Sequence, residues 1–253
     1  MLKVLLLLFK GAKFGPILLT CGTMILSIWV YATMFGWQYA VGFVGLIFVH
    51  EMGHYLAAKQ RGLNVGAPTF IPFVGAWIDM KDKPHNVETE AYVGLAGPFT
   101  GTLGALACYY IGRSYDSQLF MALAYAGFII NLFNLIPMSP LDGGRVTAVL
   151  SPRIWLLGAP IMVALFFWIR SPLLIFIGIM AWPQLRRAFR YDPKDPANAA
   201  YYTISAEHRL FYTVYSLALT GFLALMAYDL HTELHMSLHL GSGVDPGMGT
   251  ASP

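Results

Sequence analysis

The chain alternates long apolar stretches with short polar loops over most of its length. A helix needs about 20 apolar residues to cross a hydrocarbon core, and seven stretches approach or exceed that length: 14–35, 37–58, 91–111, 119–137, 153–169, 172–187 and 208–230. The fifth and sixth are short and are separated only by Arg170, Ser171 and Pro172, so they form either a tight helical hairpin or one broken element. The pattern predicts an all-α polytopic membrane protein, a bundle of six to seven transmembrane helices.

The segment 59–90, between the second and third apolar stretches, has a different character. Within it GAPTFIPFVGAWIDM holds two prolines and two glycines and shows no helical period. Phe70, Phe73 and Trp77 fit a short strand or β-hairpin lying at the membrane surface. An irregular interfacial loop with aromatic anchors is the alternative.

The two ends of the chain are expected to lie outside the bundle. Residues 1–13 hold a short apolar run between lysines, which favours an interfacial helix. We expect one transmembrane domain over 1–230, with its motifs in about 37–150, and a short tail over 231–253 that is flexible from 240 onward. His231, His235 and His239 recur every four residues and favour a solvated or interfacial helix, with a weak metal site as the alternative.

Composition agrees with a membrane protein and excludes several other classes. Hydrophobic residues make up 57% of the 253 and charged residues 11%, against about 25% charged in typical soluble chains. These proportions exclude a disordered or nucleic-acid-binding protein and argue against a soluble enzyme. Cys21 and Cys108 both lie inside apolar stretches, so neither a disulfide framework nor a thiolate zinc site is expected.

The distribution of cations predicts the orientation in the membrane. With seven spans and the N-terminus inside, 14 of the 16 Lys and Arg residues fall on the cytoplasmic side, and only Arg113 and Arg170 fall outside. We expect a multi-pass protein of a prokaryotic inner membrane with its active site near the cytoplasmic face; an organellar membrane is the alternative.

One acidic group lies well inside an apolar stretch, where a charge costs about 2.5–3.5 kcal/mol on insertion scales. This group is Glu51, in His50-Glu51-Met52-Gly53-His54. Residues four apart share a helix face, so His50 and His54 can bind one zinc ion, and Glu51 can act as general base on a water that the zinc activates. A polar cluster that only packs spans together would be costly.

A catalytic zinc takes three protein ligands, and the third should lie at the same depth. The fourth stretch runs in the same direction as the second and ends in NLFNLIP, after which Pro137 and Pro140 break the helix. Asp142 follows on unwound backbone at the same side of the membrane, whereas Asp116 and Asp229 fall on the opposite side. Asp142 is therefore the expected third ligand, with an ordinary Asp-Gly turn as the alternative.

Small residues line part of the third stretch. Gly94, Gly97, Gly101 and Gly104 lie three or four residues apart, and such residues let helices approach closely. We expect them to serve helix packing, with the opening of a substrate cleft as the alternative.

These motifs together resemble those of the site-2 protease family of intramembrane zinc metalloproteases. HEMGH in one span is followed by NLFNLIPMSPLDGGR, and FIPFVGA and LAGPFTGTLGA also resemble the family's pattern, over roughly residues 40–150. The resemblance implies zinc ligands at His50, His54 and Asp142, a catalytic base at Glu51, and an asparagine at Asn134 that steadies substrate or oxyanion. Asn131, one turn earlier, matches less clearly.

The resemblance implies regulated intramembrane proteolysis. The expected protein is a metalloendopeptidase with one Zn²⁺ per chain that hydrolyses peptide bonds in transmembrane segments of single-span membrane proteins within the lipid bilayer. Nucleic acid is not an expected partner. The alternative function is that of a polytopic zinc-binding membrane protein without proteolysis, either a transporter or a scaffold. A transporter would place ionisable groups near the midplane and along a path, whereas here they converge at one end of two spans.

Overall fold

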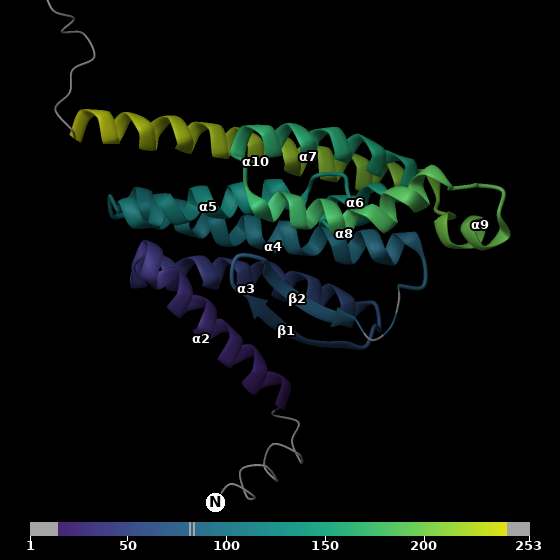
Figure 1. The fold of residues 1–253 in the computed structure, drawn as a ribbon, viewed down its shortest axis with the longest axis horizontal. Helices are drawn as coiled ribbons and strands as arrows, with labels where there is room; N and C mark the ends of the chain where they lie inside the picture. Colours follow the sequence, from purple (N-terminus) through teal and green to yellow (C-terminus); the bar gives the residue numbers. More distant parts are fainter. Residues whose placement is uncertain (1–14, 81, 83, 242–253) are drawn as a thin grey trace, which may run out of the picture.

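The structure is a computed structural model that describes residues 15–80, 82 and 84–241 of the chain. Its helices run side by side in an elongated bundle, and a small sheet lies against α3 (Figure 1). The elements in chain order are α2 Gly15–Phe35, α3 Trp37–Gln60, β1 Val65–Ile71, β2 Gly75–Met80, α4 Val87–Ser114, α5 Gln118–Asn134, α6 Asp142–Thr147, η1 Pro152–Ile154, α7 Trp155–Ile169, α8 Pro172–Phe189, α9 Pro196–Tyr202 and α10 Ala206–Gly241. The predicted helical fold with a small hairpin after the second apolar helix is confirmed.

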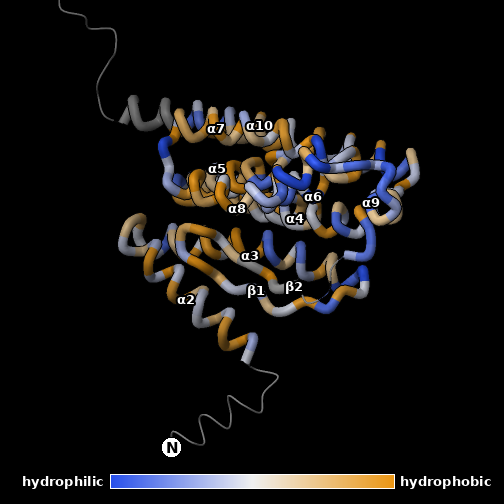
Figure 2. Tube along the Cα trace, turned by 45° about the vertical axis from the view of Figure 1, so that its right-hand side comes forward, coloured by the Kyte–Doolittle hydropathy of each residue, from blue (hydrophilic) through white to orange (hydrophobic). Residues whose placement is uncertain are grey.

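The described residues include five helical segments that are long and apolar enough to cross a membrane. They are α2, α3, α4, the segment Pro152–Ile169 that contains α7, and α10. Helix α5 is a shorter apolar helix, and α8 has 18 residues of which the last turn holds two arginines. Hydrophobic residues line the helices, and hydrophilic ones gather at the end of the bundle that carries α9 (Figure 2). These features are those of a multi-pass membrane protein; six or seven spans stays a prediction.

Local sequence explains where the helices that carry the site begin and end. Gly36 separates α2 from α3 and has a φ of 83°, a conformation that favours glycine. The side chain of Asn86 accepts a hydrogen bond from the Thr89 N–H at 2.9 Å and so caps the start of α4. After α5, Pro137 and Pro140 stop the helix from continuing, and the chain turns before α6 begins at Asp142.

The segment between α3 and α4 is a β-hairpin and not an irregular loop. Strands β1 and β2 pair antiparallel, from Val65 opposite Met80 to Ile71 opposite Gly75. Directly after the turn, Gly75 at the start of β2 has a φ of 116°, a value that an L side chain rarely adopts. The predicted hairpin is thus confirmed in position and type.

Helix α2 holds the outer edge of β1. The Thr20 hydroxyl donates to the Pro68 carbonyl at 2.6 Å, and the Thr23 hydroxyl accepts from the Phe70 N–H at 3.1 Å. These bonds satisfy backbone groups of β1 that no strand pairs, so the hairpin is anchored to the bundle by the edge opposite β2.

The last helix extends further than the apolar pattern predicts. Helix α10 contains the predicted span 208–230 but runs on to Gly241, so the segment after 230 continues as helix and not as a tail. An ion pair holds this extension against α4: the Arg113 guanidinium donates two hydrogen bonds, of 2.7 and 2.6 Å, to the Glu233 carboxylate. The interfacial helix predicted over 1–13 lies outside the described residues, and so do residues 242–253 of the tail predicted over 231–253.

Close approach between α3 and α4 depends on a glycine. A Cβ on Gly53 would overlap the Thr100 hydroxyl and the Ala96 carbonyl of α4, whereas a Cβ on Gly45, two turns earlier on α3, would meet nothing within 4 Å. Substitutions at the two glycines therefore form a matched comparison, because Gly53 lies against α4 and Gly45 does not.

We predict that Gly53→Ala destabilises the metal-free protein while Gly45→Ala does not. Overpacking of a close helix contact costs about 1–3 kcal/mol, whereas alanine at an open helical position is neutral or stabilising by up to about 1 kcal/mol. Thermal unfolding of the chelator-treated protein in detergent measures both. Equal melting temperatures for the two variants would contradict the packing described for α3 and α4.

Candidate metal centre

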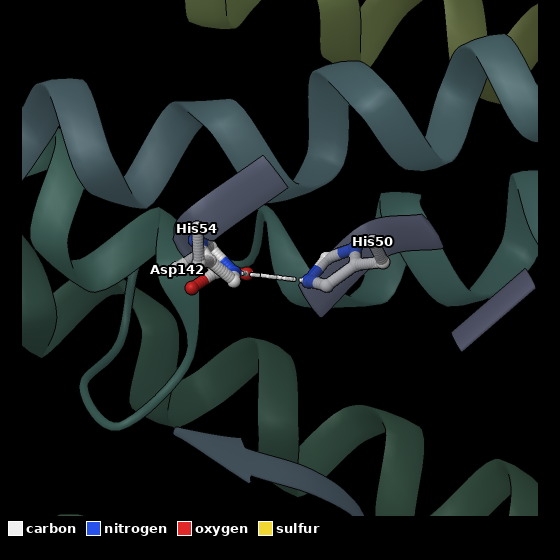
Figure 3. Close-up of side chains that lie close together, drawn as sticks. All are labelled: His50, His54 and Asp142. Atoms are coloured by element: carbon white, nitrogen blue, oxygen red, sulfur yellow. Dashed lines mark hydrogen bonds and ion pairs between the residues drawn. The ribbon is translucent and has the colours of Figure 1, made fainter. Parts of the chain in front are cut away.

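Three buried side chains from two distant parts of the sequence converge on one point. His50 and His54 lie one turn apart on α3, and Asp142 is the first residue of α6. The His50 and His54 Nε2 atoms are 3.1 Å apart, and each lies 3.2 Å from the Asp142 Oδ2 (Figure 3). Among the described residues, this is the one group of three or more His, Cys, Asp or Glu side chains that could hold a metal ion.

Hydrogen bonds to the far side of each ring fix the histidine tautomers. The His54 Nδ1 lies 2.7 Å from the Val93 carbonyl, which can only accept, so this nitrogen carries the proton. The His50 Nδ1 lies 2.8 Å from the Asn131 Oδ1, and the Asn131 Nδ2 donates to the Gly127 carbonyl at 2.7 Å, which fixes the orientation of the amide. Both rings therefore turn an unprotonated Nε2 toward Asp142.

The third ligand is also an unprotonated acceptor. The Asp142 Oδ2 lies 3.2 Å from the Nε2 atoms of both histidines. Two imidazole lone pairs and a carboxylate oxygen thus face one another in a buried space. A cation shared by these three atoms would offset the cost of burying them, because uncompensated buried acceptors are costly.

The donor set fits zinc. Two imidazole nitrogens and one carboxylate oxygen are ligands of catalytic zinc sites, and ligands of a tetrahedral zinc at about 2.0–2.1 Å lie about 3.3 Å from each other. The three ligand atoms here are separated by 3.1 to 3.2 Å. Hydrogen bonds from the Nδ1 atoms to a carbonyl and an amide oxygen are the outer contacts that orient metal-binding histidines.

The turn that carries Asp142 is braced from the side opposite α3. The Trp155 Nε1 donates to the Gly144 carbonyl of α6 at 2.7 Å. Met138 and Leu141, just before Asp142, are buried in a cluster with residues of α7 and α8. The α7–α8 pair therefore holds the third ligand in place from behind.

A cavity of about 320 Å³ lies beside two of the three proposed ligands, His54 and Asp142. Glu51 and Asn134 line it together with His54 and Asp142, and so does Arg145 from α6. Ala76 and Ile78, two residues apart on β2, form part of its wall. The cavity thus brings one further carboxylate, an amide and a strand to the metal centre.

The glycines of α4 make room for this centre. A Cβ on Gly97 would overlap the His54 ring, and a Cβ on Gly101 would overlap the Asn131 amide. A Cβ on Gly94 would lie 2.8 Å from the Arg145 Cβ. These glycines therefore pack α4 against its neighbours, as predicted, and they also leave space for the side chains of His54, Asn131 and Arg145.

The two candidate asparagines have different surroundings. Asn131 contacts His50, whereas the Asn134 Nδ2 donates to the Ile130 carbonyl of its own helix at 3.1 Å while lining the cavity. The position of Asn131 beside His50 and that of Arg145 in the cavity were not predicted from the sequence. Sequence spacing could have indicated both residues. Asn131 lies three residues before Asn134, and Arg145 lies three residues after Asp142, so each is about one helical turn from a predicted site residue.

The C-terminal histidines lie away from this centre. The His231 Nδ1 is 3.2 Å from the Tyr125 hydroxyl, near the end of the bundle that carries Arg113 and Glu233. The side chains of His235 and His239 lie outside the part that the structure describes, so the weak metal site stays an untested alternative.

We predict that Asn131→Ala lowers the affinity for zinc by about 10–100-fold, the usual effect of removing a group that orients a ligand. Asn134→Ala is the matched control and should leave affinity unchanged, because in the described part of the chain Asn134 hydrogen-bonds the Ile130 carbonyl of its own helix and no histidine. Competition titration with a chromophoric chelator measures both variants. A loss in Asn134→Ala as large as that in Asn131→Ala would contradict the assigned geometry.

Comparison with known proteins agrees with this centre. Residues 38–116 match the model of Peptidase family M50, a segment that includes His50, Glu51 and His54 but not Asp142. A zinc metalloprotease of Methanocaldococcus jannaschii is 30% identical over 113 residues, which cover 42% of this chain and 32% of the relative. Zinc metalloprotease Rip3 of Mycobacterium tuberculosis is 31% identical over 115 residues, 42% of this chain and 29% of the relative.

A plant protein is similar over the same share of the chain. The chloroplastic zinc metalloprotease EGY1 of Arabidopsis thaliana is 26% identical over 153 residues, 42% of this chain and 28% of the relative. The aligned segments thus span less than a third of each of these relatives. The resemblance that the motifs indicated is confirmed: residues 38–116 match the model of Peptidase family M50, and these relatives are named zinc metalloproteases.

Proposed function

We propose that the chain is an intramembrane zinc metalloprotease that hydrolyses peptide bonds in the transmembrane segments of membrane proteins. The observation that carries this proposal is the convergence of His50, His54 and Asp142 within 3.2 Å, beside a cavity that also holds Glu51. A structural zinc site is closed by four protein ligands, whereas a catalytic one takes three. Three ligands and an adjoining cavity favour catalysis.

We assign the chemistry to residues that line this cavity. Bound zinc lowers the pKa of water toward about 7 and polarises a carbonyl group. Glu51 takes the proton from the attacking water and gives it to the leaving amine as the peptide bond breaks. Asn134 donates to the oxygen on which negative charge develops. His50, His54 and Asp142 hold the metal.

The hairpin supplies a means of binding an unwound substrate. A helical peptide bond is protected because its carbonyl group is already hydrogen-bonded, so a substrate must become extended before it is cut. The outer edge of β1 is held by α2, while Ala76 and Ile78 of β2 face the cavity. We propose that the substrate pairs with β2 as an added strand beside the metal centre.

We propose that the active site lies near the cytoplasmic face of a prokaryotic inner membrane. His54 is six residues from the end of α3, where Lys59 and Arg61 follow. Most cations of the chain fall on that side when the N-terminus is inside. A centre at this depth can receive water from the cytosol, and the substrates are single-span membrane proteins.

We predict that Glu51→Gln abolishes cleavage without loss of zinc. Removing the general base should lower the rate by about 10²–10⁴-fold, because Glu51 is not a metal ligand. Asp142→Ala, in contrast, should weaken zinc binding by more than about 100-fold. The measurement pairs zinc content with cleavage of single-span peptides in liposomes. Wild type that binds zinc but cleaves none of a broad peptide panel would instead favour a zinc-binding transporter or scaffold.

We predict that proline in β2 abolishes cleavage while zinc content stays at one per chain. Ala76→Pro and Ile78→Pro each remove a backbone donor from the strand. Ile78→Ala keeps the backbone donor and is the matched control, which should retain most of the activity. Cleavage that survives both proline substitutions would exclude β2 as the strand that binds substrate.

A further inference from the structure

A second cavity lies outside the metal centre, at the end of the bundle that carries α9. Its volume is about 300 Å³, and it is enclosed by η1, the beginning of α7, the end of α8, and α9. Nothing in the proposed peptide hydrolysis uses it. The residues that line it include Trp155, Arg186, Arg187, Arg190, Asn198 and Tyr202.

Three positive charges in this cavity have no carboxylate partner. Arg186, Arg187 and Arg190 are exposed, and in the part of the chain that the structure describes no carboxylate oxygen lies within 4.0 Å of their nitrogens. Cations at a helix C-terminus are common because of the helix dipole. That preference explains a basic last turn, but it does not explain why the turn faces a cavity lined by polar side chains from a second helix.

The other wall supplies a hydroxyl donor that stays protonated. Burial, together with the negative charge of Glu90, raises the pKa of Tyr202 to about 12. Glu90 itself accepts a hydrogen bond from the Tyr201 hydroxyl at 2.6 Å. On the same helix, the Asn198 amide is held by the Asp192 carbonyl at 2.9 Å. Guanidinium groups together with a hydroxyl donor are the partners that a phosphate group selects.

An apolar stripe on α8 leads into the arginines. Ile179, Trp182 and Phe189 are 67%, 58% and 74% exposed and share a helix face with Arg186. The Arg186 guanidinium lies 5.7 Å from the centre of the Trp182 ring. Binding of a free phosphate ion would require the arginines but not the exposed apolar residues of α8. An apolar face that ends at a basic pocket fits a molecule with both acyl chains and a charged headgroup.

We propose that this cavity binds the phosphate headgroup of an anionic phospholipid, whose acyl chains lie along the exposed stripe of α8. Basic pockets at the cytoplasmic ends of transmembrane helices suit such headgroups. One side chain links this cavity to the turn that carries the third proposed metal ligand: Trp155 lines the cavity and donates to the Gly144 carbonyl two residues after Asp142. A bound lipid therefore packs against the residue that braces the third metal ligand.

The test measures lipid binding to the purified full chain in a neutral detergent and does not depend on proteolysis. Dioctanoyl phosphatidylglycerol is titrated, and bound lipid is counted by native mass spectrometry. The triple variant Arg186→Gln, Arg187→Gln, Arg190→Gln should bind at least about tenfold more weakly than wild type, since each cation contributes to the attraction. Dioctanoyl phosphatidylcholine should bind no better to wild type than to this variant.

Matched controls separate this pocket from general surface charge. The variant Lys59→Gln, Arg170→Gln, Arg209→Gln removes three exposed cations elsewhere and should bind phosphatidylglycerol as wild type does. A loss as large as that of the pocket variant would overturn the proposal, as would equal binding of the two lipids by wild type. Glycerol phosphate that binds as tightly as the lipid would overturn the lipid assignment. Arg187→Gln alone should show an intermediate loss if the triple variant does not fold.

Discussion

The structure is organised around three buried acceptors that repel one another unless they share a cation. The Nε2 atoms of His50 and His54 and the Oδ2 of Asp142 lie 3.1 to 3.2 Å apart, and none of the three carries a proton when both rings are neutral. The rings cannot relieve this repulsion by changing tautomer, because Val93 and Asn131 hold the protons on the opposite nitrogens. The fold therefore presents a metal-binding group at a substantial electrostatic cost.

Much of the surrounding packing serves to keep this group in place. Helix α4 approaches α3 closely enough for Gly97 to lie against the His54 ring, and Gly101 leaves space for Asn131. On the other side, Trp155 and the α7–α8 pair hold the turn that begins at Asp142. The hairpin closes one wall of the adjoining cavity. The strand proposed to bind substrate, the proposed general base Glu51 and the metal-binding group thus lie on adjacent elements around one cavity.

The sequence was sufficient to predict those parts that depend on local spacing. The i, i+4 spacing in HEMGH places His50 and His54 on one face of α3, and the shared direction of two apolar stretches brought Asp142 to the same side. The hairpin followed from prolines and glycines in a segment without helical period. The distinction between Asn131 and Asn134 could not be predicted, because both lie within one turn of α5. Which of them reaches His50 depends on how α5 rotates against α3.

Other features depend on tertiary packing that no short motif encodes. Helix α10 continues to Gly241 although its hydropathy falls, and the pairing of Arg113 with Glu233 links two residues that are 120 positions apart. The basic cavity arises because α9 folds back against the end of α8. From the sequence alone, the arginines of this cavity indicate only the orientation of the chain in the membrane. No motif between them and Tyr202 predicts that α9 packs near the end of α8.

X-ray absorption at the zinc edge on the purified full chain tests the central claim most directly. The account predicts one zinc per chain, with nitrogen and oxygen ligands at about 2.0–2.1 Å, an imidazole scattering pattern and no sulfur. A sulfur shell at about 2.3 Å would assign the metal to Cys21 or Cys108. That result, or a chain that binds no zinc, would contradict a metal centre made of His50, His54 and Asp142.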